Sequence, residues 1–265
     1  MNDQNSKQTE QTTKEINQPT EPTTIVMTKT DLNKHKVVSP NEWLEARKNL
    51  LIQEKEFTHL RDKLSRQRRE LPWVKVEKEY VFEGPNGKET LADLFEGRSQ
   101  LVIYHFMFAP EWEEGCPSCS FWADNFDGIV IHLQHRDVSF AAISRAPIKK
   151  LSAFKKRMGW GFNWVSSGNN DFNYDYHVSF PAGAPKEELE YNYRKLEIDS
   201  PDLPGVSVFY KDGRANVHHT YSVYSRGIDI YNTAYNYLDL VPKGRDEDNF
   251  EFSMDWLRYH DRYDQ

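Results

Sequence analysis

The chain contains only two cysteines, Cys116 and Cys119, and they are three positions apart. An apolar stretch of strand length, 101–108, precedes them, and a stretch that can continue as a helix, 121–126, follows. A C-x-x-C at a strand-to-helix junction is typical of redox-active dithiols. The spacing therefore predicts thiol–disulfide chemistry at this point of the chain.

The start of a helix would give the two sulfurs different roles. Unpaired backbone N–H groups and a partial positive charge at that end favour a thiolate over a thiol. The pKa of the first cysteine should then fall from ~8.5 toward the ~3.5–7.5 range of reactive cysteines. Pro117 suits the first helical turn, where its missing N–H costs little. We predict that Cys116 is the nucleophile and that Cys119, one turn on, resolves the mixed disulfide.

Two other interpretations of the cysteine pair stay open. A zinc site needs four ligands, and the sequence has no second C-x-x-C. The pair His218-His219 could supply two ligands, but adjacent histidines do not match the usual spacing, so no metal site is predicted. The cysteines could also be buried and inert, because free cysteine is often a small core residue.

The composition limits the class of protein. The chain has 265 residues and a formal net charge of -7, which argues against nucleic acid as a partner. Two cysteines are too few for a disulfide scaffold. The sequence has no apolar run of about twenty residues that could span a membrane, and no apolar signal core near Met1. We expect a cytoplasmic protein without a membrane partner.

The N-terminal part divides into a tail and a long helix. Residues 1–30 are polar, and we expect a disordered tail there. Within 31–72, Ser39 and Glu42 match a capping box, and a helix should run to about residue 70. Its apolar residues Trp43, Leu50, Phe57 and Leu64 recur at seven-residue spacing. This stripe could pack on its own domain or pair two copies in a homodimer.

From residue 73 to 246 we expect one α/β domain, followed by a C-terminal segment, 247–265. Turn residues at 84–87 indicate a hairpin. The remaining predictions from the residue pattern are a short helix at 89–95, an insertion at about 181–203, an edge strand at 218–222, and a helix at 230–240. A docking helix is expected after residue 252, and no function is attached to it.

Several segments resemble known proteins. Residues 87–97, the apolar strand and the C-x-x-C together resemble thioredoxin-like proteins of the thiol-reductase and peroxiredoxin type. Residues 138–144 and 149–159 resemble their next parallel strand and the helix after it. Residues 203–214 resemble their proline, strand and hairpin, which implies a cis bond at Pro204 beside the cysteines; the alternative is an ordinary trans proline at the start of a strand. The span 38–246 resembles a bacterial family of unknown function, domain 899, through 112–124, 144–147 and 237–240. The resemblance implies a thioredoxin-like fold, with a mixed central sheet flanked by helices, and a redox role.

The chain departs from peroxiredoxins close to its first cysteine. They have Thr or Ser three residues before the peroxidatic cysteine, and here Glu113 holds that position. A carboxylate there would repel the thiolate and raise its pKa, which argues against direct peroxide reduction. The alternative is that Glu113 and Glu114 simply face solvent. Arg145, just past the end of a strand, could offset that charge or could be a plain surface arginine. Trp112, Arg145 and Pro204 are the predicted substrate-binding residues, and Pro204 would help to hold an extended substrate segment.

The sequence therefore favours a thiol–disulfide oxidoreductase. It would act on a protein or small-molecule disulfide or thiol, with a thiol reductant as partner and no organic cofactor. A weak thiol peroxidase is a variant of this prediction. The rival from another class is a binding module that holds a small ligand with tyrosines such as Tyr221 and Tyr224, its cysteines being inert.

Overall fold

The computed structural model describes residues 35–185 and 188–263. The expected tail at 1–30 lies outside these residues. One large sheet forms the centre, with the strand order β1-β10-β9-β4-β5-β6-β2-β3. Its strands are β1 (Val74–Lys75), β2 (Val81–Gly84), β3 (Gly87–Thr90), β4 (Gln100–His105), β5 (Val138–Ser144), β6 (Asn163–Ser166), β9 (Gly205–Lys211) and β10 (Val217–Tyr224).

The middle of this sheet is mixed, as predicted. β4 and β5 are parallel, and the chain between them forms helices α2 (Pro117–Ala123) and α3 (Asp127–Gln134). β9 is antiparallel to β4 and forms a hairpin with β10. This arrangement confirms the α/β thioredoxin-like fold. β10 is not the predicted edge strand, because β1 pairs with it on its outer side.

The two faces of the sheet carry separate cores, because successive strand residues point to opposite sides. Val102 and Tyr104 of β4 face a core shared with α2, α3 and α4 (Ile148–Arg157). Leu101 and Ile103 face the other core, which the short 3-10 helix η2 (Asp93–Phe95) and α5 (Phe172–Asp175) cover. β4 is therefore buried on both faces, and it provides a rigid base for the cysteines that follow it.

Three further predicted elements differ in the structure. The predicted helix at 89–95 begins as strand β3, because 87–90 pair with β2 across the predicted hairpin, and only η2 is helical. The helix predicted at 230–240 shortens to α6 (Thr233–Leu238) after the 3-10 helix η4 (Ser225–Tyr231). The docking helix expected after 252 is wrong, since residues 252–263 form turns and irregular structure.

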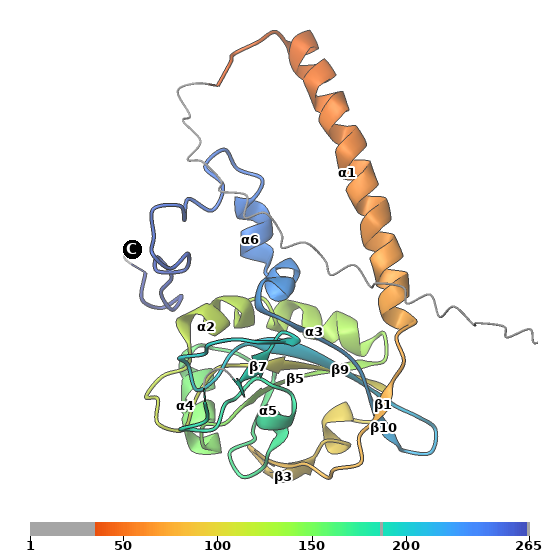
Figure 1. Ribbon diagram of the computed structural model, residues 1–265, viewed down its shortest axis with the longest axis vertical. Helices are drawn as coiled ribbons and strands as arrows, with labels where there is room; N and C mark the ends of the chain where they lie inside the picture. Colours follow the sequence, from red (N-terminus) through yellow and green to blue (C-terminus); the bar gives the residue numbers. More distant parts are fainter. Residues whose placement is uncertain (1–34, 186–187, 264–265) are drawn as a thin grey trace, which may run out of the picture.

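The long helix α1 (Pro40–Arg69) projects from the body of the molecule (Figure 1). The predicted capping box is present: the Ser39 side chain accepts from the Glu42 N–H, and the Glu42 carboxylate accepts from the Ser39 N–H. No residue of α1 is buried, and Phe57 is 66% exposed. The prediction that the apolar stripe packs on its own domain is therefore wrong for the described residues.

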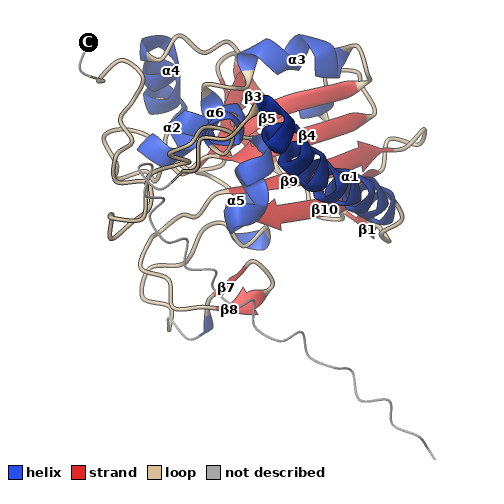
Figure 2. Ribbon diagram, turned by 90° about the horizontal axis from the view of Figure 1, so that it is seen from above, coloured by secondary structure: helices blue, strands red, loops and turns tan. Residues whose placement is uncertain are grey.

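The insertion forms a small separate unit beside the sheet. Its strands β7 (Glu190–Tyr191) and β8 (Arg194–Lys195) pair only with each other and lie apart from the main sheet in Figure 2. Tyr191 packs there with Val178 and Tyr224 in a third apolar cluster.

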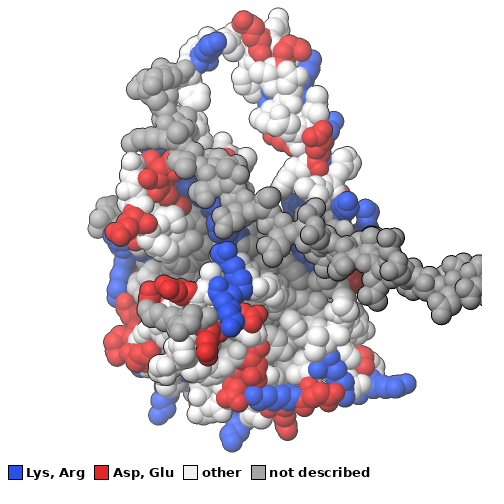
Figure 3. All heavy atoms as spheres, in the orientation of Figure 1, with Lys and Arg blue, Asp and Glu red and all other residues white. Residues whose placement is uncertain are grey.

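The surface is mixed in charge. On the face shown in Figure 3, basic and acidic side chains alternate and form no broad field of one sign. In the part of the chain that the structure describes, no helix is long and apolar enough to cross a membrane.

Candidate active site

The two cysteines lie where the sequence places them, at the start of a helix behind β4. Cys116 is the N-cap of α2, and Pro117 is its first residue. Both cysteines are free thiols, and they approach each other to 4.0 Å. Cys116 is half-buried, whereas only 1% of Cys119 is exposed. Solvent therefore reaches only the first of the two residues to any extent.

Main-chain bonds from the end of β4 hold the pair. The Cys116 N–H donates to the Met107 carbonyl over 3.0 Å, and the Met107 N–H donates to the Cys119 sulfur over 3.4 Å. The residue before Cys116 must be glycine, because a Cβ on Gly115 would lie 2.7 Å from the Phe106 ring. The loop thus follows the strand end closely.

The pKa values of the two thiols move in opposite directions. The pKa of Cys116 is lowered to about 7, first by the hydrogen bond with the Cys119 side chain and then by the N–H groups of Cys119 and Ser118. Burial raises the pKa of Cys119 well above its usual value, and the neighbouring Cys116 raises it further. The predicted direction at Cys116 is present, and its cause is specific hydrogen bonds.

A tyrosine that the sequence analysis did not single out borders this pair. Tyr104 is buried, and its hydroxyl lies next to Cys119. Burial raises the pKa of Tyr104 well above its usual value, and the neighbouring Cys119 and Cys116 raise it further. Alternation along β4 could have placed Tyr104 on the same face as the cysteines, but not beside them.

Arg145 is neither a surface arginine nor a partner of Glu113. Its Nε donates to Asp202 Oδ1 over 2.7 Å, and its Nη1 donates to the Tyr174 hydroxyl over 3.0 Å. The side chains of Arg145 and Asp202 are only 12% and 3% exposed. Arg145 therefore joins the end of β5 to the end of the insertion.

Pro204 does not have the predicted cis bond, because every peptide bond among the described residues is trans. Pro204 lies directly before β9, as the resemblance implied, but its peptide bond is trans. Its carbonyl accepts a 2.7 Å hydrogen bond from the Tyr191 hydroxyl. The insertion thus occupies a backbone group that was expected to hold a substrate.

Trp112 and Glu113 lie on the loop before the cysteines. Trp112 is half-buried against the core that contains Cys116, and its carbonyl accepts from Lys150 Nζ over 2.8 Å. The Glu113 side chain is 91% exposed and lies 3.6 Å from the same Lys150 nitrogen. The expected repulsion between Glu113 and the thiolate is therefore replaced by an exposed ion pair.

His218 and His219, the two histidines weighed against a zinc site, have other partners. His218 lies 3.3 Å from Asp212, and His219 bonds Ser222 over 2.7 Å. Within residues 35–185 and 188–263, no group of three or more His, Cys, Asp or Glu side chains could hold a metal ion.

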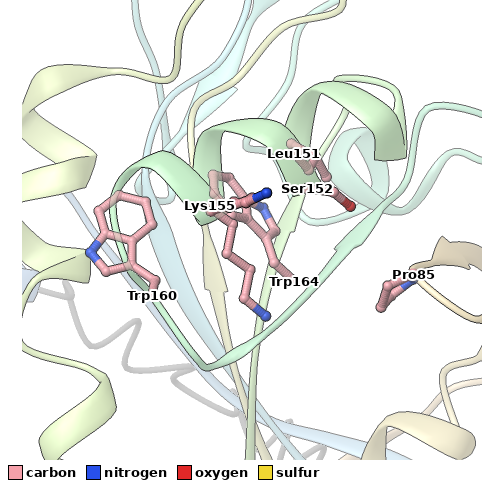
Figure 4. Close-up of a pocket in the computed structure, with 7 residues that line it drawn as sticks. Pro85, Leu151, Ser152, Lys155, Trp160 and Trp164 are labelled. Atoms are coloured by element: carbon pink, nitrogen blue, oxygen red, sulfur yellow. The ribbon is translucent and has the colours of Figure 1, made fainter.

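A separate hollow of about 370 Å³ lies between α4 and the β2–β3 turn (Figure 4). Two indole rings, Trp160 and Trp164, and the Lys155 and Lys156 side chains line it, with Pro85 on the opposite side. None of the predicted site residues borders this hollow. Burial lowers the pKa of Lys155.

Comparison with known proteins gives a family and a set of distant structural likenesses. None of the curated proteins matches the chain. The peroxidoxin BcpB of Mycobacterium tuberculosis is 16% identical, with 61% of this chain and 90% of that chain covered and a TM-score of 0.45. A peroxiredoxin Q of Xanthomonas campestris is 15% identical, with 60% and 89% covered and a TM-score of 0.42.

Likeness at this level says nothing about activity. The family comparison is more direct, because one model matches residues 32–263, which include the long helix, the cysteines and most of the C-terminal segment. The chain belongs to the family described as bacterial proteins of unknown function, DUF899.

Proposed function

We propose that the protein is a thiol–disulfide oxidoreductase with Cys116 as nucleophile and Cys119 as resolving thiol. The observation that carries this proposal is the contrast within the pair. At neutral pH a pKa of about 7 leaves much of Cys116 as thiolate, whereas the pKa of Cys119 is raised so that it keeps its proton. The reactive form is thus on the sulfur nearer to solvent.

The reaction would run by two exchanges. The Cys116 thiolate attacks one sulfur of a substrate disulfide, and the other substrate sulfur leaves as a thiolate. Cys119 then gives up its proton and attacks Cys116, so that a Cys116–Cys119 disulfide forms and the second substrate thiol leaves. The substrate gains two electrons, which a thiol reductant must later return to the protein. A reducing cytoplasm, the proposed location, supplies such thiols.

Exchange kinetics with cysteine variants test this proposal. The wild-type protein should reduce 5,5′-dithiobis(2-nitrobenzoate) with release of two thiols per protein. Cys119→Ser should release one thiol and stay as a mixed disulfide, whereas Cys116→Ser should be almost unreactive. A Cys116→Ser variant with wild-type turnover would refute the assignment. Hydrogen peroxide in place of the disulfide tests the peroxidase variant, which the outward position of Glu113 leaves open.

The hollow between α4 and the β2–β3 turn favours a second candidate function, binding of a small ligand. The tyrosines predicted for it are engaged elsewhere: the Tyr224 hydroxyl donates to the Tyr176 carbonyl, and Arg68 lies over the Tyr221 ring. Trp160 and Trp164 with Lys155 would instead suit a small aromatic anion. Indole-3-acetate is a suitable probe: a ligand of the native state must raise the thermal midpoint, and Lys155→Ala should remove that shift.

A further inference from the structure

We infer that the substrate is a low-molecular-weight disulfide or thiol rather than an extended segment of a protein. This inference rests on the proposed function of Cys116 and Cys119. It comes from two parts of the chain outside the C-x-x-C: the insertion, which bonds the backbone before β9, and the C-terminal segment, which bonds the loop before Cys116. We call residues 252–263 the C-terminal strap.

The backbone around Pro204 is already paired within the chain. The Leu203 N–H donates to the Val178 carbonyl over 2.9 Å, and the Pro204 carbonyl accepts from Tyr191 over 2.7 Å. Gly205, the next residue, lies opposite residues of both β4 and β10. An extended peptide binds by adding a strand to free backbone groups, and proline itself has no N–H to offer. A peptide segment therefore has little to pair with here.

Buried polar bonds hold the insertion in that position. Asp202 Oδ1 accepts from Arg145 over 2.7 Å and from the Ser179 hydroxyl over 2.6 Å. The Tyr191 hydroxyl that bonds Pro204 also accepts from the Ser225 N–H over 2.8 Å. Release of the backbone around Pro204 would break several of these hydrogen bonds at once, so the insertion is held in one position.

The C-terminal strap contacts the loop that leads into Cys116. The Tyr259 hydroxyl donates to the Gly115 carbonyl over 2.6 Å, and the Tyr259 ring packs edge-on against Phe154 of α4. The guanidinium groups of Arg157 and Arg262 lie 4.9 Å and 5.1 Å from the centre of the same ring. In Figures 1 and 2 this segment lies on the side of α2 and α4.

Ion pairs fasten the strap to that loop. Glu114, next to Gly115, accepts from Arg157 over 2.6 Å and from Arg262 over 2.9 Å. Asp261 accepts from the same Arg157 over 2.8 Å. His260 lies 2.7 Å from Asp124, which follows α2. The strap is thus attached to the loop before Cys116 and to both helices next to it.

Disulfide exchange needs direct contact between sulfur atoms, so these neighbours select substrates by size. Cys116 is partly exposed, whereas Cys119 is buried, so the inference places the attack on a small disulfide at Cys116. A disulfide in a protein brings its flanking backbone with it, and that backbone meets the strap and the insertion. Exclusion by these parts would lower the exchange rate for proteins and leave small disulfides unaffected.

The experiment compares thiol probes and substrates of two sizes on the full chain. N-ethylmaleimide and a polyethylene-glycol maleimide share their reactive group, so their rate ratio at Cys116 reports access without any need for turnover. We expect the rate with N-ethylmaleimide divided by the rate with the polyethylene-glycol maleimide to be about tenfold larger for Cys116 than for a free cysteine peptide. Cystine should be reduced at least about tenfold faster than insulin. A tenfold difference in rate corresponds to about 1.4 kcal/mol in activation free energy. Equal ratios for the protein and the peptide would overturn the inference.

Variants of the strap make the test specific. Arg262→Ala with Tyr259→Phe removes the hydroxyl and one ion pair, and it should lower the maleimide ratio and speed insulin reduction. Tyr263→Phe is the control in the same segment, since within the described residues its hydroxyl bonds the Arg258 N–H and no other group. A strap variant that folds, judged by its thermal midpoint, yet keeps the wild-type ratio would refute the role of the strap. Slow reaction of Cys116 even with N-ethylmaleimide would instead refute the proposed function.

Discussion

At the scale of single residues, identical thiols differ because their surroundings differ. Cys116 receives hydrogen bonds that favour its charged form, whereas Cys119 is buried where charge is disfavoured. Neither effect needs a long helix, since α2 spans only Pro117–Ala123. The hydrogen bonds that lower the pKa come from Ser118 and Cys119 themselves.

The pH dependence of alkylation tests this contrast. With a pKa of about 7, Cys116 should react with iodoacetamide at half its maximal rate near that pH, and Cys119 should stay unmodified in the native protein. Mass spectrometry after timed quenching separates the two sites. A half-maximal rate near the ordinary thiol value, or equal labelling of both cysteines, would contradict the prediction.

His105 is a second buried group with an altered proton affinity. Its Nε2 lies 2.8 Å from the Ser207 hydroxyl, and its Nδ1 has no partner among the described residues. Burial lowers the pKa of His105 from 6.5 to about 3. The native state therefore keeps this histidine neutral at pH values where the unfolded chain binds a proton.

This difference makes stability depend on pH in a defined direction. The contribution is complete above pH 6.5 and is lost as the pH falls toward 3, because the unfolded state gains a proton that the native state does not. Within that window the free energy of unfolding should fall by up to about 1.4 kcal/mol per pH unit from His105 alone. His105→Gln should reduce the slope by that amount in urea titrations. An unchanged slope in this variant would refute the assignment.

At the scale of elements, the Arg145–Asp202 pair fixes the insertion against β5. Both side chains are nearly buried, so removal of one partner leaves an uncompensated charge inside the protein. The gain from such a pair is modest, but the penalty for breaking it is large. The Arg145–Asp202 pair therefore holds the insertion in its position.

Urea unfolding of single and double variants tests the contribution of this ion pair to stability. Arg145→Met should lower the free energy of unfolding by about 3–5 kcal/mol, and the added change Asp202→Leu should recover most of the loss. Arg98→Met, at an ion pair with the more exposed Glu96, is the control and should cost less than about 1 kcal/mol. Equal losses of unfolding free energy in the Arg145 and Arg98 variants would contradict a stabilising role of the buried ion pair.

At the scale of the whole molecule, α1 is an extended apolar surface without a partner in the described chain. Trp43, Leu50, Phe57 and Leu64 are 47–66% exposed along one stripe. Most helices in proteins owe their stability to the packing of such a face. A second copy of the chain, paired through α1, would cover it, and this homodimer stays a prediction.

Sedimentation equilibrium decides the oligomeric state. The wild-type protein should give twice the chain mass, and Leu50→Glu with Phe57→Glu should give a monomer with its C-x-x-C reactivity unchanged. Lys55→Glu, on the opposite side of α1, should leave the dimer intact. A wild-type monomer at all concentrations would exclude pairing through α1.

Local patterns in the sequence were enough for the elements that depend on near neighbours. Ser39 and Glu42 start α1 through bonds across three residues, and the C-x-x-C spacing places Cys119 one turn after Cys116. The strand at 138–144, which the resemblance to thioredoxin-like proteins implied, is present at those residues as β5. The capping box and the C-x-x-C spacing need only the periodicity of a helix, which the order of residues specifies directly.

Contacts between distant segments followed from no such pattern. Tyr259 meets Gly115 across 144 residues, and Arg145 meets Asp202 across 57. The trans bond at Pro204, the position of the Tyr104 hydroxyl beside Cys119 and the exposed stripe of α1 likewise depend on how the folded elements pack. A tyrosine or an arginine can bond many kinds of group. The folded structure therefore decides which group is its partner, and the residue type alone does not. The position of the cysteine pair could therefore be predicted from the amino-acid order, whereas the contacts that the insertion and the C-terminal segment make around it could not.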